Sequence, residues 1–236
     1  MVYDIAGLRI NIKNRCRYTT EFCKEYLSED QSSPCDLEAE VTNEEFYAEK
    51  EASPGYVDGY IENICLYRKI CLQMPKFNRF LLHAAILQVG ENAYAFSGRS
   101  GAGKSTHTGL WLKYVDGAKI LNGDKPIVEK RGDEFIAYGT PWMGKEGRGE
   151  KGAAPIRSIC FIEKAPKNAI RRLSVAELTA RIFPQLLIPT DEEAAAKALE
   201  LCDAFVVGVP AYELECDISK GAVETSYAEM TGNPLA

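Results

Sequence analysis

The 236-residue sequence has little histidine, and its cysteines do not form metal-binding patterns. It contains two histidines, His83 and His107, and eight cysteines without a single C-x-x-C pair. No cysteine stands beside a histidine at the spacing of a zinc site, which argues against a structural zinc module. A chain of this length buries a core without disulfide staples. The scattered cysteines therefore predict reduced thiols that pack as small core residues in the cytoplasm.

Positive charge and long hydrophobic runs are also scarce. The chain has 28 Lys and Arg against 34 Asp and Glu, a net charge of −6, so it has no general attraction for DNA, RNA or anionic lipid. Its longest apolar stretch, residues 80–89, is too short to span a bilayer. The N-terminus has neither a basic region nor a long apolar region, so no signal peptide is predicted. We expect a cytoplasmic protein with neither nucleic-acid nor membrane partners.

The composition, 46% hydrophobic and 26% charged, is typical of a globular protein. Apolar patterns predict strands over 2–13, 80–89, 93–96, 119–122, 126–130, 134–138, 158–163, 205–209 and 212–217. Helical patterns cover 17–27, 43–52, 61–74 and 106–115, a helix that begins at Ser174, and 191–201. The hairpins at 80–96 and 126–138 require antiparallel pairs. The sequence therefore predicts one α/β domain with a mixed sheet over 76–236, and a small N-terminal α/β lobe over 1–75.

Residues 98–105 (GRSGAGKS) match the pattern G-x-x-x-x-G-K-[ST] at every fixed position. The motif follows a predicted strand and opens a predicted helix, which is the context that a phosphate-binding loop requires. Glycines let successive N–H groups turn toward phosphate oxygens, and the helix N-terminus adds its dipole. We expect Lys104 to reach the β- and γ-phosphates of ATP and Ser105 to bind Mg²⁺. The alternative is a glycine-rich turn with an incidental lysine. The predicted nucleotide-binding residues are Gly98, Arg99, Ser100, Gly101, Ala102, Gly103, Lys104, Ser105 and Thr106.

Asp124 follows the predicted strand 119–122, at the point where P-loop proteins keep the acid that holds Mg²⁺. The alternative is an ordinary turn residue in an Asn-Gly-Asp sequence. His83 lies one hairpin before the glycine-rich loop, and it is either a core histidine or an active-site residue. His107 lies early in the predicted helix, where packing or solvent exposure is the common role.

The segment 139–149 (GTPWMGKEGRG) combines glycines with two cations, Lys145 and Arg148. Cations on a glycine-hinged loop can close over a phosphoryl group and stabilise the charge of its transition state. The alternative is a surface loop whose Trp142 packs into the core.

Together these residues resemble HPr kinase/phosphorylase, a family that shares its nucleotide-binding core with phosphoenolpyruvate carboxykinase. The resemblance is carried by the motif at 100–106, the acid Asp124 and the preceding hairpin with His83. It is strongest toward small HPr kinase-related ATP-binding proteins, which have runs similar to 82–84, 105–111, 120–122 and 138–145. The resemblance covers most of the chain, while its specific motifs lie within 82–145.

The resemblance implies a P-loop fold of the HPr kinase and phosphoenolpyruvate carboxykinase type, with ATP and Mg²⁺ as cofactors. It implies phosphoryl transfer to a serine-like hydroxyl of a protein or a small molecule, with Ser105 and Asp124 at the metal and His83 beside that acid. Relatives usually carry two consecutive acids where this chain has Gly123 and Asp124, and one of them is the general base, so Gly123 leaves the base unassigned. An ATP-binding sensor with little turnover and a nucleotide hydrolase remain alternatives. True carboxykinases are much longer chains.

Overall fold

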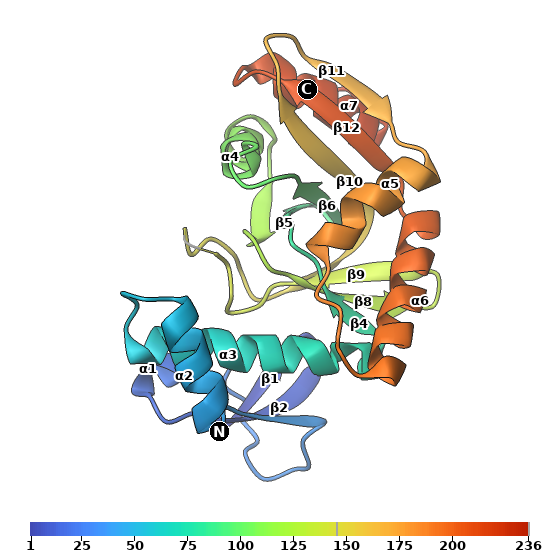
Figure 1. Ribbon diagram of the computed structural model, residues 1–236. Helices are drawn as coiled ribbons and strands as arrows, with labels where there is room; N and C mark the ends of the chain where they lie inside the picture. The colour runs from blue at the N-terminus through green and yellow to red at the C-terminus, as the bar shows by residue number, and fades with distance from the viewer. Residues whose placement is uncertain (145, 236) are drawn as a thin grey trace.

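The computed structural model describes residues 1–144 and 146–235, and its first part is built on a three-stranded sheet. β1 (Val2–Ile5) and β2 (Leu8–Lys13) form an antiparallel hairpin, and β3 (Leu37–Glu40) pairs with β2 in parallel. Ala6 and Gly7 turn the hairpin with φ angles of 52° and 72°, so the strand predicted over 2–13 is two strands. The helical elements of this part are α1 (Arg17–Phe22), η1 (Lys24–Tyr26), α2 (Asn43–Ala52), α3 (Asp58–Gln73) and η2 (Met74–Phe77), seen in blue and cyan in Figure 1.

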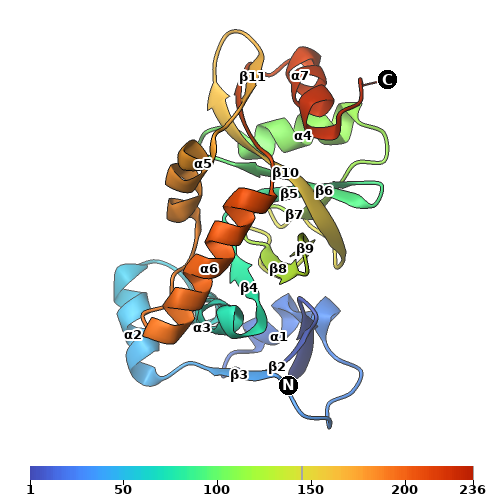
Figure 2. The same cartoon turned by 90° about the vertical axis from the view of Figure 1, so that its right-hand side faces the viewer.

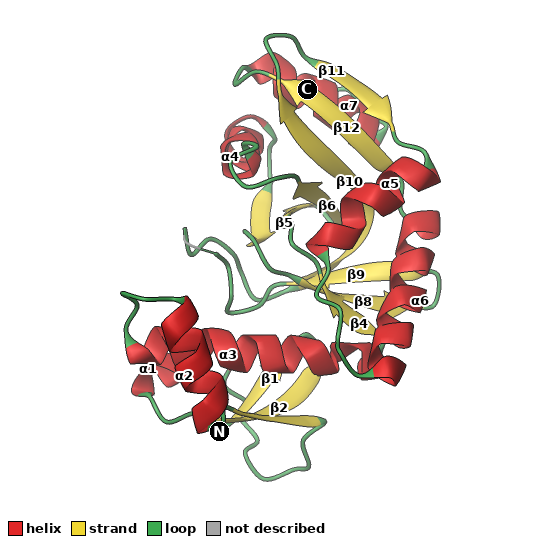
Figure 3. Ribbon diagram, viewed as in Figure 1, coloured by secondary structure: helices red, strands yellow, loops and turns green. Residues whose placement is uncertain are grey.

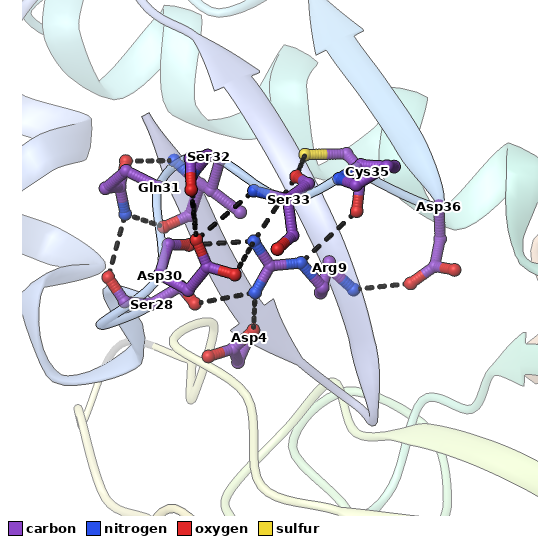
Figure 4. A network of polar contacts seen from close by, with 11 residues as sticks. Asp4, Arg9, Ser28, Asp30, Gln31, Ser32, Ser33, Cys35 and Asp36 are labelled. Carbon is purple, nitrogen blue, oxygen red and sulfur yellow. Dashed lines mark hydrogen bonds and ion pairs between the residues drawn. The ribbon is translucent and has the colours of Figure 1, made fainter.

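Arg9 of β2 anchors the polar loop that joins η1 to β3 (Figure 4). Its guanidinium donates to Ser28 Oγ at 3.1 Å and to the carbonyl oxygen of Asp30 at 2.8 Å. The backbone N–H of Arg9 donates to the Asp36 carboxylate at 2.7 Å. Arg9 therefore forms hydrogen bonds with residues at both ends of this loop.

The second sheet is mixed and has nine strands, with the path β4-β8-β9-β10-β6-β5-β7, while β12 joins β10 and β11 joins β12. β6 is parallel to β10 and β10 to β12, whereas β5 is antiparallel to both β6 and β7. The mixed sheet predicted from the two hairpins is therefore confirmed. Its strands are β4 (Arg79–Leu81), β5 (Ala85–Val89), β6 (Asn92–Ser97), β7 (Lys119–Asn122), β8 (Ile127–Arg131), β9 (Glu134–Tyr138), β10 (Ala153–Lys164), β11 (Ala169–Arg172) and β12 (Ala211–Cys216).

Helices cover both faces of this sheet (Figures 2 and 3). α4 (Lys104–Tyr114) and α7 (Lys220–Thr231) lie on one face, and α5 (Val175–Ile182), η3 (Phe183–Gln185) and α6 (Glu192–Gly208) lie on the other. Successive side chains of β10 alternate between the two cores, since Cys160 and Ile162 pack with the α4 side and Ile159 and Phe161 with the α6 side. Of the eight cysteines predicted as core residues, six are buried, at positions 23, 65, 71, 160, 202 and 216, whereas Cys16 is half-buried and Cys35 is exposed. Within the described ranges, no helix is long and apolar enough to cross a membrane.

Two predicted strands are wrong. Residues 80–89 do not form one strand, because β4 pairs with β8 while β5 pairs with β6. Between them the N–H of His83 donates to Gln185 O at 2.9 Å and that of Ala84 to Asp124 O at 3.1 Å. Residues 205–209, predicted as a strand, are the end of α6 and the residue that follows it. The apolar run continues a helical spacing of buried residues, which include Ala194, Ala198, Leu201, Cys202 and Phe205.

The N-terminal part shares a core with the large sheet. Ile127 of β8 and Trp142 belong to the same cluster of buried side chains as residues of β1, β2 and α3. Arg79 of β4 is buried, and it donates to the carbonyl of Ala6 at 2.9 Å and pairs with Glu129 at 3.2 Å. The division into 1–75 and 76–236 stays a prediction.

The loop predicted over 139–152 folds back across the end of β7. Gly139 N–H donates to Gly152 O at 3.0 Å, and Glu150 N–H donates to Leu121 O at 3.2 Å. A Cβ atom at Gly139 would stand 1.8 Å from Glu150 O, and one at Gly123 would stand 2.8 Å from Met143 O. Glycine is required at both positions because the backbone approaches so closely.

His107 is buried between α4 and α7. Its Nε2 lies 3.0 Å from Ser226 Oγ and accepts a hydrogen bond from Trp111 Nε1 at 3.2 Å. Burial lowers the pKa of His107 to about 4. His107 therefore packs as a neutral core residue, in line with the packing role considered from the sequence.

We expect Gly123→Ala to destabilise the protein by roughly 1–3 kcal/mol, the usual cost of an overpacked site. The new Cβ would meet two carbonyl oxygens, Met143 O at 2.8 Å and Arg148 O at 2.9 Å. Gly109→Ala on α4 is the control, since its Cβ would have no heavy atom within 4 Å and alanine favours a helix by about 1 kcal/mol over glycine. Urea unfolding measures both variants. A Gly123→Ala variant as stable as the wild type would contradict this packing.

We also expect stability to fall as the pH drops from about 6.5, the ordinary pKa of histidine, toward 4. In this window an unfolded His107 takes up a proton that the folded residue does not hold, because its folded pKa is lowered to about 4, so protons favour unfolding. The slope of the free energy of unfolding against pH should be shallower in His107→Gln by up to about one proton. Equal slopes in the two proteins would show that His107 does not cause the acid sensitivity.

Candidate functional site

The glycine-rich loop 98–103 connects the end of β6 to the start of α4. Gly98, Gly101 and Gly103 have φ angles of 145°, 79° and 108°, conformations that favour glycine. A Cβ at Gly98 would also lie 3.2 Å from Ile162 O. Gly103 is the N-cap of α4, so the first N–H groups of this helix have no partner within it. The predicted strand, loop and helix are all in place, and the loop conformation depends on its glycines.

Lys104 is the first residue of α4, and its side chain bonds back to the start of the loop. Its ammonium donates to the carbonyl of Gly98 at 2.9 Å. Burial lowers the pKa of Lys104, and the Asp124 carboxylate acts against that shift. Ser105 and Thr106 are exposed in the first turn of the helix.

A buried amide, Asn122 at the end of β7, builds the turn that carries Asp124. Its Oδ1 accepts hydrogen bonds from the N–H groups of Asp124 at 3.0 Å and Lys125 at 2.8 Å. Its Nδ2 donates to Thr140 Oγ1 at 2.9 Å and to Trp142 O at 3.3 Å. This role of Asn122 was not predicted, although an asparagine two residues before the acid is typical of such a turn.

The Asp124 carboxylate contacts two side chains. His83 Nε2 lies 3.1 Å from Oδ1, and Lys125 Nζ lies 2.5 Å from Oδ2. Burial raises the pKa of Asp124, but the hydrogen bonds from His83 and Lys125 outweigh burial and hold it well below its usual range. The carboxylate is therefore ionised and accepts from both partners, so His83 Nε2 carries the hydrogen of this contact. Lys125 was not among the predicted site residues.

These groups meet at one edge of the sheet. Ser97, the last residue of β6, donates through Oγ to the carbonyl of His83 at 3.0 Å. Because β5 is antiparallel to both β6 and β7, the carboxyl ends of β6 and β7 lie at the same edge, where α/β proteins commonly bind ligands. The structure therefore brings the glycine-rich loop, Lys104, His83 and Asp124 together.

The second acid of the resembled family does not fit here. Any side chain at Gly123 would meet the carbonyl oxygens of Met143 and Arg148, and these belong to the loop that crosses the end of β7. Gly144 of the same loop lies over the acid, since its Cβ would stand 2.6 Å from Asp124 Cβ. The side chains that contact the Asp124 carboxylate are therefore His83 and Lys125, with no second acid beside it at position 123.

Of the two predicted loop cations, the structure describes Arg148, whose role at a phosphoryl group stays a prediction. Lys145 lies outside the described residues. The Arg148 guanidinium pairs with Glu146 at 3.4 Å and is 53% exposed, while its carbonyl oxygen faces Gly123. Trp142 is buried and stacks on Tyr67 with ring centroids 4.1 Å apart. The core position considered for Trp142 is therefore the observed one.

A cavity of about 420 Å³ opens beside the loop on the α4 face of the sheet. Its walls come from the start of α4 and from the segments after β10 and β12, so no local sequence pattern could have predicted it. In the strand order it lies across β6 from Asp124, because β10 and β12 flank one side of β6 and β5 and β7 the other. The lining residues are Ala102, Gly103, Thr106, His107, Leu110, Ile162, Lys164, Ala165, Pro166, Cys216, Asp217 and Ile218.

The donor groups at the sheet edge are compatible with Mg²⁺. Among the described residues, no cluster of three or more His, Cys, Asp and Glu is placed to hold a metal ion. Mg²⁺ that binds together with a nucleotide needs only one or two protein ligands, because phosphate and water oxygens supply the rest. The exposed hydroxyl-bearing Ser105 and the ionised Asp124 are oxygen donors of this type.

No protein-family model matches the chain, and the search of curated proteins gave no match. Among solved structures, the chain is similar to the Hpr(Ser) kinase/phosphatase from Coxiella burnetii, with 12% sequence identity and a TM-score of 0.34. The match covers 64% of this chain and 93% of that one. This is a distant structural similarity, and a TM-score this low supports no assignment of family, reaction or ligand.

Proposed function

We propose that the protein binds ATP with Mg²⁺ through Gly98–Thr106 and transfers the γ-phosphoryl group to a hydroxyl of a protein or a small molecule. One observation carries this proposal: the glycine-rich loop with Lys104 follows β6 and Asp124 follows β7 at the same sheet edge, where His83 contacts both Ser97 and Asp124. Residues 76–236 would form the nucleotide-binding domain, with 1–75 packed against it.

The cavity beside the loop supports a nucleotide rather than a simple phosphate compound. The phosphates would lie at the end of β6, with the γ-phosphoryl group toward Asp124 in the turn after β7 and the nucleoside toward the cavity at β10 and β12. Apolar side chains dominate the cavity and suit a planar base, namely Leu110, Ile162, Ala165, Pro166 and Ile218. Lys164 and Asp217 at its rim supply partners for the phosphate and the ribose hydroxyls. Ile218 is 77% exposed, and covering such a side chain with a base would remove apolar surface from water.

The chain's own residues have distinct roles in this reaction. Lys104 and the N–H groups of the loop neutralise the charge of the phosphates. Ser105 and Asp124 hold Mg²⁺, which when bound supplies further charge neutralisation for the transferred group. His83 contacts Asp124 through Nε2, and in this proposal its Nδ1 accepts the proton of the hydroxyl acceptor. Positioning and charge neutralisation contribute more to such transfers than a base does.

Lys104→Ala tests the nucleotide site. We expect its affinity for ATP with Mg²⁺ to fall at least about tenfold, because a hydrogen bond to a charged group is lost. The control is Lys113→Ala at the far end of α4, whose ammonium lies over the ring of Tyr114. Isothermal titration calorimetry measures both variants. Wild-type affinity in Lys104→Ala would refute the site.

Incubation with γ-labelled ATP and a cell extract then tests the reaction. The proposal expects a labelled acceptor that disappears with Lys104→Ala. Release of free labelled phosphate instead would identify a nucleotide hydrolase. Tight binding with neither product would identify an ATP-binding sensor.

Ile218→Asp tests the position of the nucleoside. The variant should weaken the binding of both ATP and ADP, because a carboxylate replaces an apolar contact with the base, and it should leave the affinity for inorganic triphosphate unchanged. Val207→Asp on α6 is a matched control, since Val207 and Ile218 are both 77% exposed. Calorimetry with the three ligands separates these effects. Unchanged nucleotide affinity in Ile218→Asp would place the nucleoside elsewhere.

A further inference from the structure

The Lys125 ammonium contacts Oδ2, the oxygen of the Asp124 carboxylate that His83 does not contact. The ammonium lies 2.5 Å from Oδ2, and the Lys125 side chain is 45% exposed. The backbone of the same residue is fixed, because its N–H donates to Asn122 Oδ1 at 2.8 Å and its carbonyl accepts from the Tyr67 hydroxyl at 2.5 Å. The Lys125 backbone is fixed, but its side chain is a flexible four-carbon chain. The ammonium can therefore move while the Cα atom stays in place.

This contact conflicts with a metal-binding role for Asp124. An ammonium in contact with Oδ2 repels a divalent cation and competes for the same lone pairs. Lys104 opens α4 after β6, and Lys125 follows Asp124 after β7, so both lysines belong to segments at the same edge of the sheet. This is the edge where the proposed function puts the γ-phosphoryl group.

A contribution to stability does not by itself explain the ion pair between Lys125 and Asp124. Ion pairs between partly exposed groups contribute about 0–1 kcal/mol to stability. Asp124 also retains the contact with His83 at 3.1 Å, so it stays hydrogen-bonded when the ammonium leaves. The geometry therefore suits a cation that exchanges its carboxylate partner for a phosphate oxygen.

We propose that Lys125 is a further catalytic residue, whose ammonium moves from Asp124 to the γ-phosphoryl group of bound ATP and frees a carboxylate oxygen for Mg²⁺. The proposal rests on the proposed function. In the transfer, the acceptor oxygen forms a bond to the γ-phosphorus, the bond to the β–γ bridging oxygen breaks, and ADP leaves with that electron pair. The hydroxyl proton passes to His83 Nδ1, while Lys125 keeps its own protons and neutralises charge.

Nucleotide binding to Lys125→Gln tests this role. We measure by calorimetry the affinity for ADP and for a non-hydrolysable ATP analogue, both with Mg²⁺. The affinity for the analogue should fall about tenfold, as expected for one hydrogen bond to a charged group, whereas the affinity for ADP stays unchanged. Lys125→Arg keeps the charge and should retain most of the affinity for the analogue. Lys130→Gln is the control, because the Lys130 ammonium donates to the carbonyl of Gly132 in the β8–β9 hairpin.

Each other outcome overturns the proposal. Equal losses for the two nucleotides, or no loss, mean that Lys125 does not contact the γ-phosphoryl group. Tighter binding of the analogue by Lys125→Gln means that the lysine only masks Asp124. A wild-type protein that binds neither nucleotide overturns the proposed function together with this inference, whereas normal wild-type binding confines a failure to Lys125. Melting temperatures confirm folding, and Lys125→Met, which keeps the aliphatic stem, replaces the Gln variant if that variant is unfolded.

Discussion

The buried amide of Asn122 is the interaction on which the site depends. It is fully buried, and its two polar atoms hold four groups from two segments of the chain. Buried polar groups that are completely paired define one geometry, because every alternative leaves a donor or an acceptor without a partner. The positions of Asp124 and Lys125 and the start of the loop at Thr140 are therefore set together. A bridge between Asn122 and Gly149 adds the other end of that loop.

The strand directions in the sheet determine which segments lie beside the turn that carries Asp124. β5 runs against both of its neighbours, so the carboxyl ends of β6 and β7 lie at one edge with the crossing segment 82–84 between them. That segment leaves the strand ladder and bonds to Asp124 O and Gln185 O. The break in the strand therefore places the imidazole of His83 beside the acid. An uninterrupted strand at this point would carry His83 in the ladder instead.

The sequence predicted features that local patterns determine. Turn and capping residues act on their immediate neighbours. A few adjacent residues therefore determine the glycine-rich loop 98–103, the hairpin 126–138 and the helix start at Ser174. Features whose cause lies in remote segments were missed. The strand break at 82–84 depends on acceptors from Asp124 and Gln185. The requirement for glycine at position 123 comes from loop carbonyls about twenty residues later.

The apolar run at the end of α6 shows a different limit. Residues 205–209, four hydrophobic residues and one glycine, suit a strand and a buried helix equally well when periodicity is the only guide. Tertiary packing determines that this run is helical, because β12 occupies the place beside β10 and α6 covers the other face of the sheet. Lys125 was missed for a simpler reason, because a lysine after a turn has the same local pattern whether it faces solvent or a carboxylate.

The stacking of Trp142 on Tyr67 has a consequence for how the molecule is assembled. Tyr67 belongs to α3, yet its hydroxyl supports the backbone at Lys125, and its ring covers a residue of the loop that crosses β7. The N-terminal region thus supplies part of the support of this sheet edge. A fragment that begins at residue 76 would lose this support and expose Trp142 to water. The final geometry of the edge therefore requires contact between α3 and residues of the middle of the chain.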